Sequence, residues 1–130
     1  MKKSTVRTIV TGVLLALLVI RLFCVYTVPV SHQLFALFLA YTACVYAGAA
    51  LSDSRTIWLS IEALISLLFF QFAFLGLLYS PIWLVAGFTL HGIWDLLHHP
   101  RVIKTKVVKW FPPLCAVFDF VVAIFIMRFY

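Results

Sequence analysis

The chain has 130 residues, of which 65% are hydrophobic and only 11% are charged, and its mean hydropathy is +1.15. A composition this apolar excludes a soluble globular domain and indicates one integral membrane domain. The formal net charge of +6 does not indicate a nucleic-acid-binding protein, because the basic residues flank the apolar runs and do not form one basic patch.

Five apolar runs approach or exceed the roughly 20 residues that a helix needs to cross a bilayer. They cover residues 6–28, 33–51, 56–79, 81–99 and 111–129. Pro29 is expected to break the first run, Pro81 to form a tight turn, and Pro100 to begin a basic loop. The sequence therefore predicts an all-α membrane protein, a bundle of five transmembrane helices in a single domain over residues 1–130.

The distribution of Lys and Arg gives the expected orientation of this bundle. With the N-terminus in the cytoplasm, most of the basic residues fall on the cytoplasmic side: Lys2, Lys3, Arg7, Arg55, Arg101, Lys104, Lys106 and Lys109. Only Arg21 and Arg128 fall towards the other side. The positive-inside rule therefore predicts a cytoplasmic N-terminus and a C-terminus on the outside.

The end of the fourth run, HGIWDLLHHP, carries three ionisable side chains at helical spacing. At about 100° per residue, His91, Asp95 and His98 fall within roughly 60° of one another on one stripe of a helix. Imidazole and carboxylate groups on such a stripe can converge on one metal ion or pass a proton along the helix. We predict these three residues as ligands of a divalent metal such as zinc.

Two further acidic residues are expected at the same depth in the membrane. At 1.5 Å per residue from the cytoplasmic ends of their helices, Glu62 lies about 10 Å deep, Asp95 about 8 Å and Asp119 about 13 Å. A charge at membrane depth costs about 2.5–3.5 kcal/mol on insertion scales, so these groups should face one another and not lipid. Glu62 and Asp119 are therefore the predicted catalytic residues, with one or the other as the general base. The plainer alternative is that all of these residues only form hydrogen bonds between helices.

The histidines do not fit a haem site in one chain. Bis-histidine ligation needs two histidines at one depth on facing helices, whereas His91, His98 and His99 share one helix and His32 is expected near the opposite side. No haem is expected.

The stretch HGIWDLLHHP, followed after the basic loop by PPLCAVFD, resembles a family of small bacterial integral membrane proteins of unknown function. The resemblance rests on H-x-x-W-D-x-L-H-H and C-x-x-x-D, and covers roughly the C-terminal half. It matches His91, Trp94, Asp95, His98, His99, Cys115 and Asp119, and Glu62 matches an acid in an earlier helix. It implies the inner membrane of a bacterium as the location and supplies no activity.

Three functions remain open at this point. The first is a membrane-embedded, metal-assisted enzyme acting on a lipid-like substrate. The second is a proton- or ion-handling carrier that uses the same side chains as a relay. The third is a structural or accessory membrane subunit. The expected partners are membrane lipids and, because five short helices can associate further, other copies of the chain.

Overall fold

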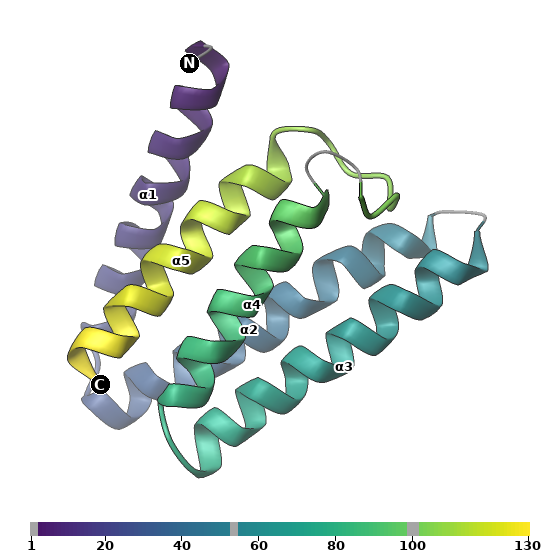
Figure 1. Cartoon of the computed structure of the whole chain (residues 1–130). Helices are drawn as coiled ribbons and strands as arrows, with labels where there is room; N and C mark the ends of the chain where they lie inside the picture. Colours follow the sequence, from purple (N-terminus) through teal and green to yellow (C-terminus); the bar gives the residue numbers. More distant parts are fainter. Residues whose placement is uncertain (1–2, 53–54, 99–101) are drawn as a thin grey trace.

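The computed structural model describes residues 3–52, 55–98 and 102–130, and within these ranges the chain forms five α-helices (Figure 1). They are α1 (Lys3–Phe23), α2 (Val28–Leu51), α3 (Thr56–Leu78), α4 (Ile82–His98) and α5 (Phe111–Phe129). The all-α fold of five helices is confirmed. His99 of the sequence motif and Lys2 and Arg101 of the charge distribution lie outside the described residues.

The boundary between α1 and α2 differs from the prediction. α1 ends at Phe23, whereas α2 begins at Val28 and includes Pro29, the residue expected to break the first run. Pro29 lies in the first turn of α2, where a backbone N–H would have no partner within the helix. The lack of an N–H in proline therefore costs the helix little stability at this position. The proline therefore begins the second helix.

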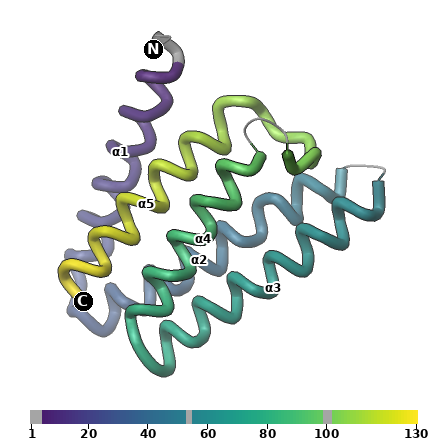
Figure 2. The backbone as a smooth tube through the Cα atoms, viewed as in Figure 1, coloured from purple at the N-terminus to yellow at the C-terminus, as the bar shows by residue number. Residues whose placement is uncertain are grey.

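Helix α4 occupies the middle of the bundle. It packs against α5 and α3, while α2 packs along α3, and α1 packs mainly on α5 at the edge (Figures 1 and 2). The N-terminus lies at the same end as the α4–α5 connection, and the C-terminus lies at the end of the α1–α2 and α3–α4 connections (Figure 1). The core between the helices is apolar, with Phe35, Leu39, Leu84 and Phe88 among its fully buried side chains.

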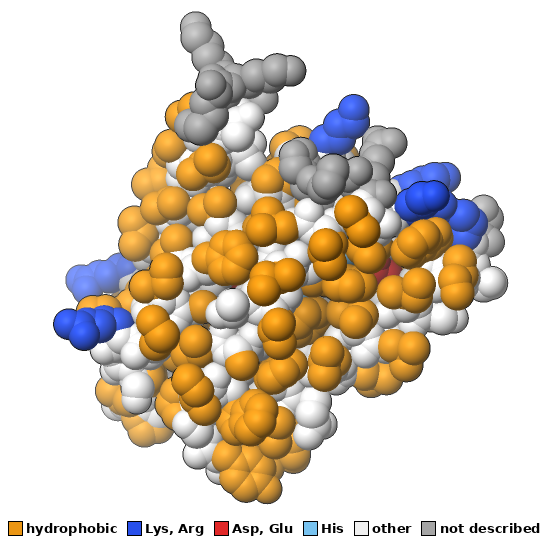
Figure 3. All heavy atoms as spheres, viewed as in Figure 1, with side chains coloured by type: hydrophobic (Ala, Val, Ile, Leu, Met, Phe, Trp, Pro, Cys, Tyr) orange, Lys and Arg blue, Asp and Glu red, His pale blue; other side chains and the backbone are white. Residues whose placement is uncertain are grey.

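The outer surface of the bundle is also apolar. Large side chains such as Leu14, Leu64 and Ile124 are more than 60% exposed, and hydrophobic side chains cover most of the face in Figure 3, with Lys and Arg at its ends. Helices α1, α2, α3 and α5 are long and apolar enough to cross a membrane, while α4, with 17 residues, is shorter. The chain thus has four candidate membrane spans, and its exposed surface suits lipid.

Gly12 allows α1 to approach α5 closely. A Cβ atom at this position would lie 2.7 Å from the backbone oxygen of Leu114, which cannot rotate away. Small residues at such contacts let the backbones of membrane helices meet. The α1–α5 interface therefore depends on the absence of a side chain at residue 12.

We predict that Gly12→Ala lowers the thermal unfolding temperature of the detergent-purified protein, with a loss of about 1–3 kcal/mol from overpacking. Gly48→Ala is the matched control, because a Cβ there meets nothing within 4 Å. Since alanine is favoured over glycine in a helix by about 0.5–1 kcal/mol, the control should be neutral or stabilising. Equal stability of the two variants would contradict the close contact.

Candidate functional site

Three buried side chains from α4 and α5 form the first polar group of the bundle. His91 and Asp95 are one turn apart on α4, and Asp119 faces them from α5. The Nδ1 atom of His91 lies 2.7 Å from Oδ2 of Asp119 and 3.6 Å from Oδ2 of Asp95. Each residue offers one donor atom within 4.8 Å of the other two, so this His/Asp/Asp group could hold a metal ion.

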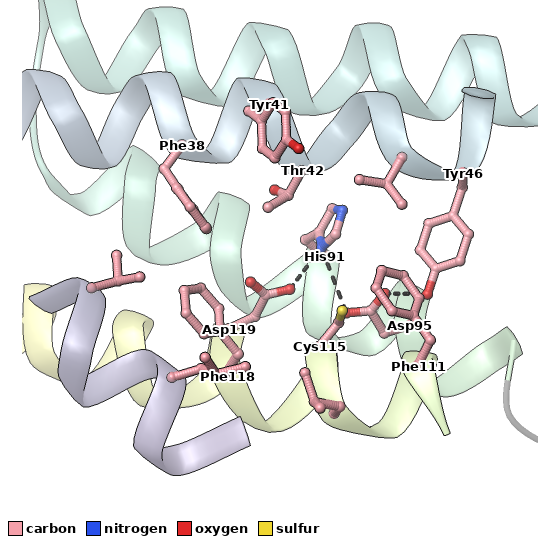
Figure 4. A pocket seen from close by; sticks show the side chains of 14 residues that line it. Phe38, Tyr41, Thr42, Tyr46, His91, Asp95, Phe111, Cys115, Phe118 and Asp119 are labelled. Carbon is pink, nitrogen blue, oxygen red and sulfur yellow. Dashed lines mark hydrogen bonds and ion pairs between the residues drawn. The ribbon is translucent and has the colours of Figure 1, made fainter. Parts of the chain in front are cut away.

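Asp95 is fully buried, yet its two oxygens have different surroundings. Oδ1 accepts a hydrogen bond from the hydroxyl of Tyr46 at 2.5 Å (Figure 4). Oδ2 has no hydrogen-bond partner within the described ranges 3–52, 55–98 and 102–130. A buried polar atom without a partner costs about 1–3 kcal/mol. This oxygen is therefore available to a proton or a cation at the side of His91.

A second polar group lies between α3, α4 and the α4–α5 connection. Oε1 of Glu62 lies 2.9 Å from Nε2 of His98 and accepts a hydrogen bond from the Thr105 hydroxyl at 2.5 Å, and Oε2 accepts one from the indole N–H of Trp94 at 3.1 Å. The Nδ1 atom of His98 lies 2.9 Å from the backbone oxygen of Trp94. Both carboxylate oxygens of Glu62 and both nitrogens of His98 are thus engaged, so this group is satisfied internally.

Tyr46 of α2 separates the two polar groups. Its hydroxyl bonds to Asp95, and its ring stacks on His98 with the centroids 3.9 Å apart and the planes 12° apart. The hydrogen-bonded chain is thereby interrupted, because the contact between Tyr46 and His98 is a ring stack.

The five residues predicted from the sequence are all buried, but they meet as two groups. Asp119 joins His91 and Asp95, and His98 joins Glu62 on the other side of Tyr46. The predicted roles, metal binding by His91, Asp95 and His98 and catalysis by Glu62 and Asp119, stay predictions. Thr105 is added by the structure and gave no signal in the sequence. Trp94 was named only through the resemblance, and its position four residues before His98 on the same face of α4 could have indicated its contact.

A pocket of about 280 Å³ opens onto the His/Asp/Asp group. Its walls are mostly apolar and come from α1, α2 and α5, including Leu15, Phe38 and Phe118, and its polar end is formed by His91, Asp95, Asp119, Tyr46 and Cys115 (Figure 4). The three candidate metal ligands therefore line a cavity, although none of their side chains is more than 4% exposed. Glu62 and His98 are not among the residues that line it.

The five helices, the apolar surface and the buried polar group define a small multi-helix protein of membrane character. The chain belongs to the family of unknown function DUF6010, whose model matches residues 7–129. No curated protein and no solved structure matches the chain. Membership in a family of unknown function is thus confirmed over nearly the whole chain, while the H-x-x-W-D-x-L-H-H signature stays a prediction.

Thr105 is 6% exposed in a segment whose lysines are exposed, so it anchors the α4–α5 connection to Glu62. We predict that Thr105→Val loosens this connection, because the lost hydrogen bond lowers the free energy that holds it to α3 by about 0.5–1.5 kcal/mol or more. Limited trypsin digestion should then cut faster after Lys104 and Lys106. Thr56→Val, at an exposed position, is the control and should leave the cutting rate unchanged. Equal rates for both variants would show that the Thr105 contact does not hold the connection.

Proposed function

We propose that this chain is a five-span protein of the bacterial inner membrane that binds a divalent metal such as Zn²⁺ through His91, Asp95 and Asp119 and uses it on a lipid-like substrate. The observation that carries the proposal is the buried Oδ2 of Asp95, which has no hydrogen-bond partner among the described residues and lies 3.6 Å from the Nδ1 of His91, in a group that lines the pocket. A cation stabilises an anionic oxygen inside an apolar bundle. Among the described residues, His91 is the one that lies close enough to give this oxygen a positive charge.

The donor set supports a catalytic metal more than a structural one. Structural zinc sites use four protein ligands, whereas catalytic sites use three and keep a position open for water or substrate. One imidazole and two carboxylates supply three donors, and two carboxylates balance the charge of a divalent ion. Ligands about 2.1 Å from a tetrahedral ion lie roughly 3.4 Å apart. The 2.7 Å contact between His91 and Asp119 would therefore lengthen, while the widest separation in the group, within 4.8 Å, would shorten.

The residues of the site divide into those that would hold the ion and those that position them. A bound divalent ion would supply a Lewis acid and an activated water. Tyr46 orients Asp95 through its hydroxyl, which is the usual role of an outer hydrogen-bond partner of a metal ligand. Glu62 is better supported as a positioning residue than as a general base, because its oxygens are occupied by His98, Trp94 and Thr105.

A proton and a metal compete for the same atoms in this site. His91 Nδ1 can donate a proton to Asp119 or bind an ion, but it cannot do both at once. A proton-handling carrier is therefore the second candidate function, favoured by the short contact between His91 and Asp119. The interruption of the hydrogen-bonded chain between Tyr46 and His98 favours the metal, because a relay needs a continuous path.

We predict that detergent-purified protein binds Zn²⁺ in stoichiometric amount, measured by elemental analysis after dialysis. Asp95→Asn and Asp119→Asn should each lose most of the metal while remaining folded, since an amide keeps hydrogen bonds but removes the charge that binds the ion. His91→Ala removes the imidazole ligand and should lose most of the metal as well. His32→Ala, on α2 and outside the pocket lining, is the control and should retain it. Wild-type protein without metal, together with pH-dependent proton flux in liposomes, would support the carrier instead. Neutral behaviour of all variants in both assays would leave only a packing role.

The proposed topology has its own test. Reporter fusions after Ser52 and Lys106 should indicate the cytoplasm, and a fusion after Tyr130 the opposite side, because the positive-inside rule places the basic segments inside. A cytoplasmic C-terminus would mean that α4 or another helix does not cross the membrane.

A further inference from the structure

We propose that the pocket takes the chain of a single-tailed lipid whose polar end is uncharged, a hydroxyl or a carbonyl group. This inference rests on the proposed function for the use of the polar end, and it deepens that function by naming the class of ligand. The position, the volume and the charges of the pocket support this class of ligand.

The mouth of the pocket lies on the lipid-facing side of the bundle. Leu15 of α1 and Tyr41 of α2 line the pocket and are 41% and 68% exposed, and both belong to candidate membrane spans. The surface beside them is apolar, with Leu14 and Leu37 each 61% exposed. A ligand would therefore enter sideways from hydrocarbon, between α1 and α2, and would need an apolar body to do so.

The volume suits one slender chain. At about 280 Å³ the pocket lies at the lower limit of the roughly 300–1,000 Å³ usual for small-molecule sites. Its side walls are large apolar side chains, among them Phe38 from α2 and Phe118 from α5. A lipid with two acyl chains would not fit these walls, whereas a single alkyl or prenyl chain fills them.

The polar end excludes an anionic head group. Among the described residues that line the pocket there is no Lys or Arg, and two of them, Asp95 and Asp119, are carboxylates. A phosphate or carboxylate would meet the like charge of two carboxylates, and the one side chain there that can carry a positive charge, His91, is already in contact with both of them. If a divalent ion is bound, the two aspartates already balance it, and the open position accepts a neutral oxygen. A hydroxyl or carbonyl oxygen at the tip of an apolar chain satisfies both conditions.

Photo-cross-linking in phosphatidylcholine nanodiscs tests the inference. The probe is a long-chain primary alcohol with a diazirine in its tail, and the labelled residues are identified by peptide mass spectrometry. We expect labelling at the pocket walls, at Leu15, Phe38 and Phe118, and competition by the unlabelled alcohol. An alkyl phosphate of the same length should compete at least about tenfold more weakly, equivalent to about 1.4 kcal/mol.

Matched tryptophan variants separate the pocket from the general lipid surface. Leu15→Trp fills the pocket and should abolish wall labelling, whereas Leu14→Trp, on the exposed side of the same helix, should leave it unchanged. Val45 of α2 also lines the pocket, so Val45→Phe gives a second test if Leu15→Trp does not fold. Labelling spread evenly over the exposed helix faces, or equal competition by the phosphate, would overturn the inference.

Zinc content measured on the same samples distinguishes the two proposals. Leu15→Trp should keep its metal, because Leu15 contributes no ligand. Wall labelling in a protein that binds no zinc would support the ligand class and overturn the metal. Zinc binding without wall labelling would support the metal and overturn the ligand class.

Discussion

Helix α4 is held in the bundle by polar side chains that reach three different neighbours. His91 bonds to a carboxylate of α5, Asp95 accepts from a tyrosine of α2, and His98 bonds to a glutamate of α3. In lipid, apolar side chains gain little by exchanging hydrocarbon for a helix interface, so close packing and interhelical hydrogen bonds decide the arrangement. α4 is also the shortest described helix. The position of α4, and with it the polar end of the pocket, therefore depends on these contacts.

The burial of these residues inside the bundle could be predicted, but their partners could not. Helix rise converts residue number to depth, and the cost of a charge in lipid requires the polar groups to face inward. Depth says nothing of how α3 and α5 are rotated about their axes. A stripe on α4 is wide enough to face both helices, so the sequence could not show that His98 meets Glu62 while His91 meets Asp119.

Features that depend on tertiary contacts between distant parts of the chain were the hardest to predict. Pro29 could end one helix or begin the next, and only the packing of α2 fixes which. Thr105 belongs to a short basic segment without periodicity, and its burial depends on that segment folding back onto α3. The helices themselves were predictable because their apolar runs are long, and the all-α assignment needs no knowledge of contacts.

The two polar groups differ in a way that separates a structural role from a functional one. Every oxygen of Glu62 has a donor, so removing a partner would only weaken the bundle. Asp95 is equally buried, yet one of its oxygens has no hydrogen-bond partner among the described residues and meets only His91, at 3.6 Å, in a residue group that lines the pocket. The hydrogen bond from Tyr46 uses only one oxygen of Asp95, so that contact does not account for the second oxygen. The Asp95 oxygen that lacks a hydrogen bond, more than the presence of charge in the membrane, is therefore the reason to assign a ligand to the His/Asp/Asp group.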